Sequence, residues 1–176
     1  MRFSDLCTLA SALSWLRVAL AAALPLLPRE WWLGVYATAL FTDVLDGRVA
    51  RSTGTATPAG ATLDAWADKA LHVNTAWTLV NEGIFPGWWM LPLFIREIVQ
   101  VPLVFVFAHR WRTGVGRPAT RPLGQLTTIF VALTLVLGLL GLPTPALTLT
   151  VGALGLAAGM DYARLHFSHL RTVPLP

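Results

Sequence analysis

Six apolar runs follow one another along the chain, at about residues 9–27, 31–47, 60–80, 88–108, 123–142 and 145–167. Each run has about the 20 residues that an α-helix needs to cross the hydrocarbon core of a bilayer. Short segments rich in proline, glycine or charged residues separate the runs, as is typical of turns. We therefore expect an all-α fold, an integral membrane bundle of six transmembrane helices that forms one domain over residues 1–176.

The composition supports a membrane protein. Of the 176 residues, 55% are hydrophobic and 12% are charged, and the charged share is about half of that in soluble domains. The mean hydropathy of +0.62 excludes a disordered chain and an ordinary cytosolic domain. Cys7 is the only cysteine, which excludes an internal disulfide and a cysteine-rich metal site. The pI near 10.2 does not indicate nucleic acid, because too few polar residues remain to build a soluble basic face.

The basic residues predict the orientation in the membrane. If the six runs alternate across the bilayer, most basic residues fall at or near one face: Arg2, Arg48, Arg51, Lys69, Arg110, Arg112, Arg117, Arg121, Arg164 and Arg171. The opposite face has only Arg29, beside Glu30. Positive residues favour the cytoplasmic side, so we expect both termini in the cytoplasm and the protein in the inner membrane.

The first run has an alternative interpretation as a signal peptide, with Arg2 in its charged region and cleavage after residues 21–23. Arg17 interrupts the apolar run and argues against this interpretation. We therefore expect the first run to remain as a helix.

Four aspartates lie where a membrane helix should not tolerate them. Asp43 and Asp46 are three residues apart and share a helix face, while Gly60, Asp64 and Asp68 follow at intervals of four on the next run. A charged residue at mid-membrane costs about 2.5–3.5 kcal/mol, so divalent cations or a water-filled cavity should compensate. Oxygen-only ligands favour Mg²⁺, Mn²⁺ or Ca²⁺ over zinc. Helix capping or close packing of small residues would explain single positions, but it explains the whole set poorly.

The order of these residues resembles the signature of the CDP-alcohol phosphotransferases at every fixed position and spacer. In this sequence the signature reads Asp43-x2-Asp46-Gly47-x2-Ala50-Arg51-x8-Gly60-x3-Asp64-x3-Asp68. The resemblance extends over the whole chain and implies a dimeric integral membrane enzyme with six helices. Enzymes of this family cleave the pyrophosphate of a CDP-linked lipid or alcohol, transfer the phosphoryl-alcohol group to a hydroxyl acceptor and release CMP.

The resemblance also implies roles for the signature residues. Metal ligands would be Asp43, Asp46 and Asp64, with two divalent cations, Mg²⁺ or Mn²⁺, clamping the attacking and leaving oxygens. Asp68 would be the catalytic base that takes the acceptor's proton, and it would also touch metal. The CDP-lipid would bind at Asp43, Gly47, Ala50, Arg51 and Gly60, where the small residues leave room for the nucleotide and Arg51 pairs with the pyrophosphate. An alternative for Arg51 is a surface anchor.

Further local likeness is to bacterial phosphatidylglycerolphosphate synthases. The similar segments are residues 14–17, 67–69, 88–89 and 95–98. This likeness implies transfer of a phosphatidyl group from CDP-diacylglycerol to a small phosphorylated alcohol, sn-glycerol 3-phosphate, in phospholipid biosynthesis.

One departure from that subfamily concerns the acceptor. Its members carry a Gly-Lys-x-Lys-Thr-like stretch at the fifth helix, whereas Gln125 and Thr127 replace the lysines here. Candidates to bind the acceptor's phosphate instead are Arg117, Arg121, Arg96 and Arg164. The alternatives are that the first two bind only anionic headgroups, that Arg96 pairs with Glu97, and that Arg164 pairs with Asp161. His72 continues the aspartate stripe, and we expect it to line the site rather than catalyse.

Three other functions stay open. Within the family, the acceptor would instead be phosphatidylglycerol, as in a cardiolipin synthase, or another polar alcohol. A six-helix carrier or channel would also hold acids in the membrane, but it would spread them through the bilayer depth or show paired repeats. An inactive scaffold would have no chemical need to keep all four aspartates.

Overall fold

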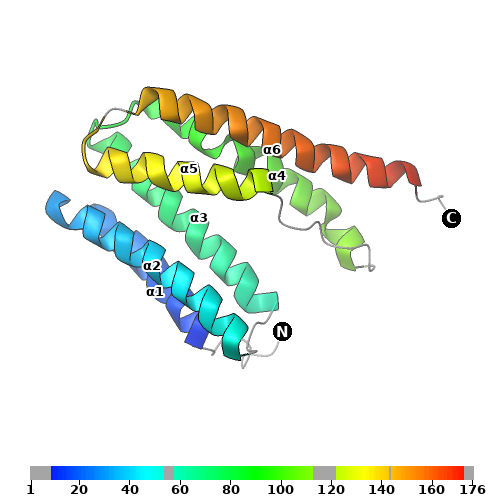
Figure 1. Ribbon diagram of the computed structural model, residues 1–176, viewed down its shortest axis with the longest axis horizontal. Helices are drawn as coiled ribbons and strands as arrows, with labels where there is room; N and C mark the ends of the chain where they lie inside the picture. The colour runs from blue at the N-terminus through cyan, green and yellow to red at the C-terminus, as the bar shows by residue number, and fades with distance from the viewer. Residues whose placement is uncertain (1–8, 54–57, 113–121, 143, 173–176) are drawn as a thin grey trace. The chain divides into compact units, whose positions relative to one another are not determined.

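The computed structural model describes residues 9–53, 58–112, 122–142 and 144–172. These residues form six α-helices in chain order (Figure 1): α1 (Leu9–Ala23), α2 (Arg29–Thr53), α3 (Pro58–Asn81), α4 (Met90–Arg112), α5 (Pro122–Leu139) and α6 (Pro145–Thr172). Two 3-10 turns, η2 (Leu24–Leu26) and η3 (Gly87–Trp89), precede α2 and α4. No strand occurs in the described ranges, so the all-α expectation is confirmed.

The helix ends follow local chemistry. Pro58, Pro122 and Pro145 are the first residues of α3, α5 and α6, where a missing N–H costs nothing and the fixed φ suits a helix. Gly83 and Gly141, which follow α3 and α5, have φ of 71° and 74°, a left-handed conformation that glycine adopts without strain. The Leu142 N–H donates to the Leu137 carbonyl and closes the end of α5.

By length and composition, two described stretches could cross a membrane, Pro122–Leu139 and Pro145–Arg164, and Ala12–Leu26 is a shorter apolar helix. The helices α2, α3 and α4 have 25, 24 and 23 residues and are long enough, but they carry several ionisable side chains. Six helices are therefore present in the described residues, whereas six membrane spans stay a prediction.

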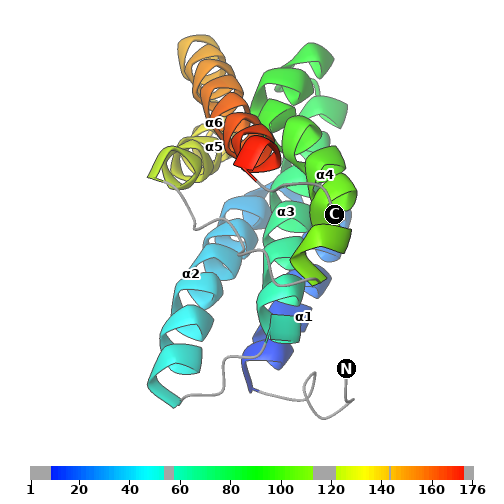
Figure 2. The same ribbon diagram turned by 90° about the vertical axis from the view of Figure 1, so that its right-hand side faces the viewer.

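The helices group into two compact units, and the single-domain expectation stays a prediction. The first unit holds α1, η2, α2, α3 and residues Leu135–Leu142. In it α1 packs against α2 and α3 (Figures 1 and 2). Arg17 of α1 hydrogen-bonds Asp64 of α3. Ala21, further along α1, accepts through its carbonyl from Asn74, which is further along α3. These two helices are therefore parallel.

The second unit holds η3, α4, the first part of α5 and α6. Three glycines of α6 lie against α4: a Cβ on Gly152, Gly155 or Gly159 would come within 2.8 Å of Pro92, 2.8 Å of Ile95 and 3.2 Å of Val99, respectively. Small residues let helix backbones approach closely, which is how helices associate in lipid. The contacts advance together along both helices, so α4 and α6 also run parallel.

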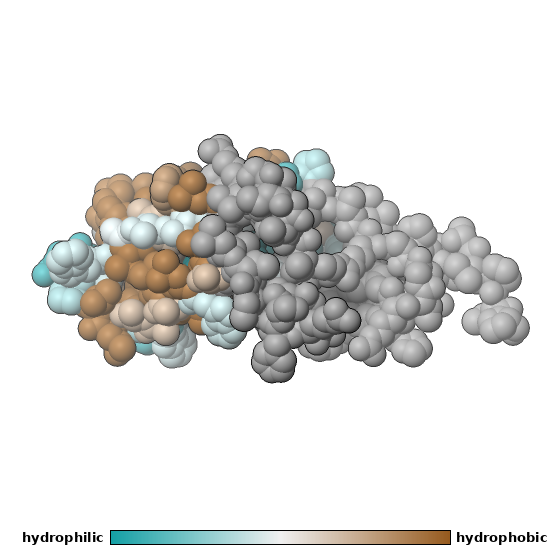
Figure 3. All heavy atoms as spheres, turned by 90° about the horizontal axis from the view of Figure 1, so that it is seen from below, coloured by the Kyte–Doolittle hydropathy of each residue, from teal (hydrophilic) through white to brown (hydrophobic). Residues whose placement is uncertain are grey.

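Large apolar side chains cover much of the outer surface of the described residues. Examples that are more than half exposed are Trp15, Trp31, Phe41, Trp66 and Trp88. Figure 3 shows such apolar side chains on one face, among paler polar ones. Exposed apolar surface on this scale is unusual in a soluble monomer and indicates contact with lipid or another apolar partner.

Candidate active site

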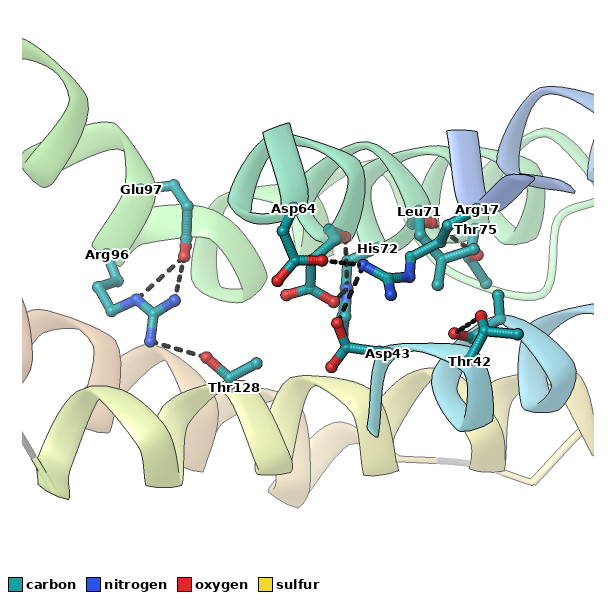
Figure 4. Close-up of polar contacts among 12 residues, drawn as sticks. Arg17, Thr42, Asp43, Asp64, Leu71, His72, Thr75, Arg96, Glu97 and Thr128 are labelled. Carbon is teal, nitrogen blue, oxygen red and sulfur yellow. Dashed lines mark hydrogen bonds and ion pairs between the residues drawn. The ribbon is translucent and has the colours of Figure 1, made fainter. Parts of the chain in front are cut away.

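The first unit brings three charged residues from three helices to one point (Figure 4). The Arg17 Nη1 of α1 lies 2.9 Å from the Asp43 Oδ1 of α2 and 2.7 Å from the Asp64 Oδ1 of α3. The Arg17 side chain is fully buried, whereas those of Asp43 and Asp64 are 37% and 40% exposed. The predicted convergence of carboxylates from two successive helices is therefore observed for this pair, with an arginine between them.

This arrangement follows from the helix packing. The signature extends over the last part of α2 and the first part of α3, and α1 packs on both helices. A buried arginine is tolerated only when its charge is paired. Two carboxylates that accept from one guanidinium nitrogen supply that pairing through charge-assisted hydrogen bonds, which are stronger than neutral ones.

Asp68 lies one turn further along α3, with 28% of its side chain exposed. The His72 Nδ1 is 2.7 Å from the Asp68 carbonyl oxygen and 3.4 Å from its Oδ1. A carbonyl oxygen only accepts, so Nδ1 carries the proton in this contact. The Tyr36 ring packs edge-on against His72 at 6.0 Å between centroids. His72 is thus buried beside Asp68, and its lining role stays a prediction.

Several expected site residues lie outside what the structure describes. The backbone of Asp46, Gly47, Ala50 and Arg51 belongs to α2, but their side chains are outside the described ones. Gly60 is half-buried in the first turn of α3. Among the described residues no three His, Cys, Asp or Glu side chains gather closely enough to hold a metal ion. The fourth carboxylate, that of Asp46, lies outside the described side chains, so the four-aspartate set stays a prediction.

A second polar cluster lies in the other unit, where α4 meets the beginning of α5 (Figure 4). The Arg96 Nη1 donates to the Gly124 carbonyl and, at 3.0 Å, to the Thr128 Oγ1. The Arg96 Nε and Nη2 lie 2.9 and 2.5 Å from the Glu97 Oε1. Arg96 therefore pairs with Glu97, as the structural alternative predicted, and it binds the α5 segment from which the lysines are missing. Its binding of an acceptor stays a prediction.

The structure says less about the other three acceptor candidates. Arg164 is exposed near the end of α6. Arg117 and Arg121 lie outside the described residues. The structure thus brings Arg96 to the beginning of α5, and the other three stay predictions.

Comparison with known proteins settles the family. Residues 3–160 match the family model described as CDP-alcohol phosphatidyltransferase, which includes the whole signature. The chain belongs to this family. The resemblance that the aspartate signature indicated is therefore confirmed.

The chain is similar to one protein of named function. A Pseudomonas fluorescens protein named CDP-diacylglycerol–glycerol-3-phosphate 3-phosphatidyltransferase is 40% identical over 97 residues. The alignment covers 53% of this chain and 46% of the relative, so this chain spans about half of that protein.

Sequence reasoning did not assign Arg17 to the site. The signal was present, because an arginine interrupts an otherwise uncharged apolar run. An ionisable residue inside a membrane helix normally faces a partner of opposite charge, and the nearest candidates were the signature aspartates. The sequence alone did not say which aspartates α1 would face.

Proposed function

We propose that this protein is a metal-dependent phosphatidyltransferase that moves the phosphatidyl group of CDP-diacylglycerol to the hydroxyl of sn-glycerol 3-phosphate. The products would be phosphatidylglycerol phosphate and CMP. The observation that carries the proposal is the convergence of Asp43 and Asp64, two residues of the family signature, on a single nitrogen atom. Membership of the family and the name of the P. fluorescens relative support these substrates.

The described donors fit divalent cations. The Oδ1 atoms of Asp43 and Asp64 both lie within hydrogen-bond distance of one small atom, so both carboxylates can point at one centre. An all-oxygen donor set suits Mg²⁺ or Mn²⁺. Asp46 and Asp68 would complete the set for two cations. When bound, such cations neutralise the phosphate charges and stabilise the leaving CMP.

Asp68 would act as the base. It would take the proton of the acceptor hydroxyl while that oxygen forms a bond to the lipid-linked phosphorus and the bond from phosphorus to the CMP oxygen breaks. The carboxyl group is partly exposed, so an acceptor can reach it, and the His72 Nδ1–H beside it donates to the Asp68 backbone carbonyl. Gly47, Ala50, Arg51 and Gly60 would bind the CDP-lipid.

The acceptor's phosphate needs cationic partners that replace the missing lysines. Arg117 and Arg121 precede α5 in the sequence and can bind phosphate with two parallel hydrogen bonds each. Arg96 contacts Gly124 and Thr128 at the same segment, and Arg164 is the remaining candidate. Without such partners phosphatidylglycerol is the better acceptor, and the protein would be a cardiolipin synthase.

The setting of the reaction is part of the proposal. Six helices would cross the inner membrane, with both termini and the active site at the cytoplasmic side, and two copies would form a homodimer. The positive-inside distribution of arginines and the exposed apolar side chains support this arrangement.

An acceptor panel tests the function. The purified chain in detergent would receive CDP-diacylglycerol, Mg²⁺ and, in separate reactions, glycerol 3-phosphate, phosphatidylglycerol, serine or inositol phosphate, with lipid products read by mass. We expect phosphatidylglycerol phosphate as the main product. Cardiolipin would reassign the acceptor. Absence of CMP release with every acceptor, together with cation flux in liposomes, would favour a carrier, and absence of both would favour a scaffold.

A further inference from the structure

Arg17 contacts two carboxylates of the proposed site, yet the reaction above gives it no role. We propose that Arg17 is an exchangeable internal counter-cation. Its guanidinium holds Asp43 and Asp64 together when no divalent cation is bound, and a divalent cation that binds these carboxylates displaces it. This inference rests on the proposed metal dependence and adds a residue that controls it.

The distances make the two cations competitors. One nitrogen, Nη1, contacts both the Asp43 Oδ1 and the Asp64 Oδ1 at hydrogen-bond distance. Asp43 and Asp64 would hold a divalent cation through the same carboxylate groups that accept from Nη1. The guanidinium and the cation are both positively charged and would therefore compete for these carboxylates.

Burial explains why the counter-cation is built in. The Arg17 side chain has no exposed surface, and arginine keeps its positive charge in proteins. Two carboxylates that lie close together repel each other, and this repulsion is stronger near an apolar interior than in water. Arg17 offsets it with one positive charge. A divalent cation offsets it with two and therefore binds these carboxylates in preference at sufficient concentration.

The side chain can make this exchange without a change of fold. Arginine has several rotatable bonds and five N–H donors, so Nη1 can leave its position between the two Oδ1 atoms while the guanidinium keeps a carboxylate partner and α1 stays packed on α2 and α3. The exchange would therefore move only side chains, and the helices would stay in place.

A cation-binding measurement tests the exchange. The full chain in detergent would be titrated with Mn²⁺, with free Mn²⁺ read by electron paramagnetic resonance, for the parent, Arg17→Gln and Arg29→Gln. Arg29 is an exposed arginine at the beginning of α2 and serves as the matched control. Arg17→Gln removes both a positive charge and the competitor, so we expect at least tenfold tighter Mn²⁺ binding. Arg29→Gln should stay within twofold of the parent.

Thermal unfolding gives a second readout. In chelator, Arg17→Gln should unfold at a lower temperature than the parent, because its carboxylates repel each other, and saturating Mg²⁺ should remove most of the difference. Unchanged or weaker Mn²⁺ binding in Arg17→Gln would overturn the proposal, since Arg17 would then only organise the ligands. If the parent itself binds neither ion, the proposed metal dependence fails instead.

A measurement on the parent covers the case in which Arg17→Gln does not fold in either buffer. Arginine side chains labelled with ¹⁵N would be followed by NMR, with the Arg17 signal assigned from Arg17→Lys. Saturating Mg²⁺ should shift the Arg17 signal. A signal that stays unchanged at saturation would overturn the exchange.

Discussion

Arg17 Nη1 lies 2.7 Å from Asp64 Oδ1, although the two residues are 47 positions apart in the chain. Because the same nitrogen contacts Asp43, the first helix takes part in a site that the family signature assigns to α2 and α3. The carboxylates of this site are thus held by a neighbour outside the signature, and substitutions there should change charge pairing and the proposed cation binding.

The first prediction concerns the metal. Chelator should abolish CMP release, and excess Mg²⁺ or Mn²⁺ should restore it. Asp64→Asn removes a proposed ligand and should lower turnover by at least about 100-fold, beyond the range of outer-shell partners. Arg17 keeps Asp43 as a partner, so the variant should still fold, as judged by gel filtration and circular dichroism. Asp161→Asn, outside the signature, is the control. Full activity in chelator would contradict the metal proposal.

The second prediction separates Asp68 from His72. Asp68→Asn removes the proposed base and should lower kcat by about 10²–10⁴-fold. His72→Gln removes one contact to Asp68 and should lower kcat by about tenfold or less, since a single hydrogen bond contributes about 0.5–1.5 kcal/mol. Steady-state kinetics with CDP-diacylglycerol would measure both. Equal losses in the two variants would make His72 part of the chemistry.

The third prediction concerns acceptor binding. Arg121→Ala should raise the KM for glycerol 3-phosphate at least tenfold, because a charge-assisted contact to phosphate contributes about 1.5–3 kcal/mol. The KM for CDP-diacylglycerol should change much less, which marks lost acceptor binding rather than lost chemistry. Arg29→Ala is the control. An unchanged acceptor KM, with phosphatidylglycerol an equally good substrate, would reassign the enzyme within the family.

The fourth prediction concerns packing between α4 and α6. In Gly152→Ala the new Cβ would lie 2.8 Å from the Pro92 Cβ, and a proline ring has little freedom to move away. Such overpacking costs about 1–3 kcal/mol. The Tm in detergent should fall by roughly 2–12 °C, at about 2–4 °C per kcal/mol for a chain of this size. Gly34→Ala, whose Cβ would meet nothing within 4 Å, should leave the Tm unchanged or raise it slightly. Equal Tm values for the two variants would contradict the close packing.

The fifth prediction concerns topology. Reporter fusions at Met1 and at Pro176 should both report the cytoplasm, because the arginine distribution places both ends on that side. Opposite sides would require an odd number of membrane spans and would make the six-span expectation wrong.

The helices and the signature were largely predictable from sequence, since both depend on local patterns. The apolar runs placed all six helices, but the second run ended near residue 47 whereas α2 continues to Thr53. An apolar run ends where the side chains become polar. A helix can continue beyond that point, because its backbone hydrogen bonds continue. The family resemblance came from fixed spacings, which the sequence shows directly.

Side-chain partners across helices were not predictable in the same way. Arg96 had a correct local alternative in Glu97, because neighbours in sequence are known in advance. Its contacts with Gly124 and Thr128 depend on how α4 meets α5. The contacts of Arg17 likewise depend on how α1 packs against α2 and α3, which no single-helix pattern determines.

The position of Arg17 has a consequence for biogenesis. At a synthesis rate of about 5–20 residues per second, Asp64 leaves the ribosome roughly 2–10 s after Arg17, given their separation of 47 positions. If α1 entered the membrane alone before Asp64 is made, its arginine would lack at least one of its two acidic partners, and an unpaired charge at mid-membrane costs about 2.5–3.5 kcal/mol. The first helix should therefore wait at the insertion machinery until the third arrives, so that the three enter the lipid together.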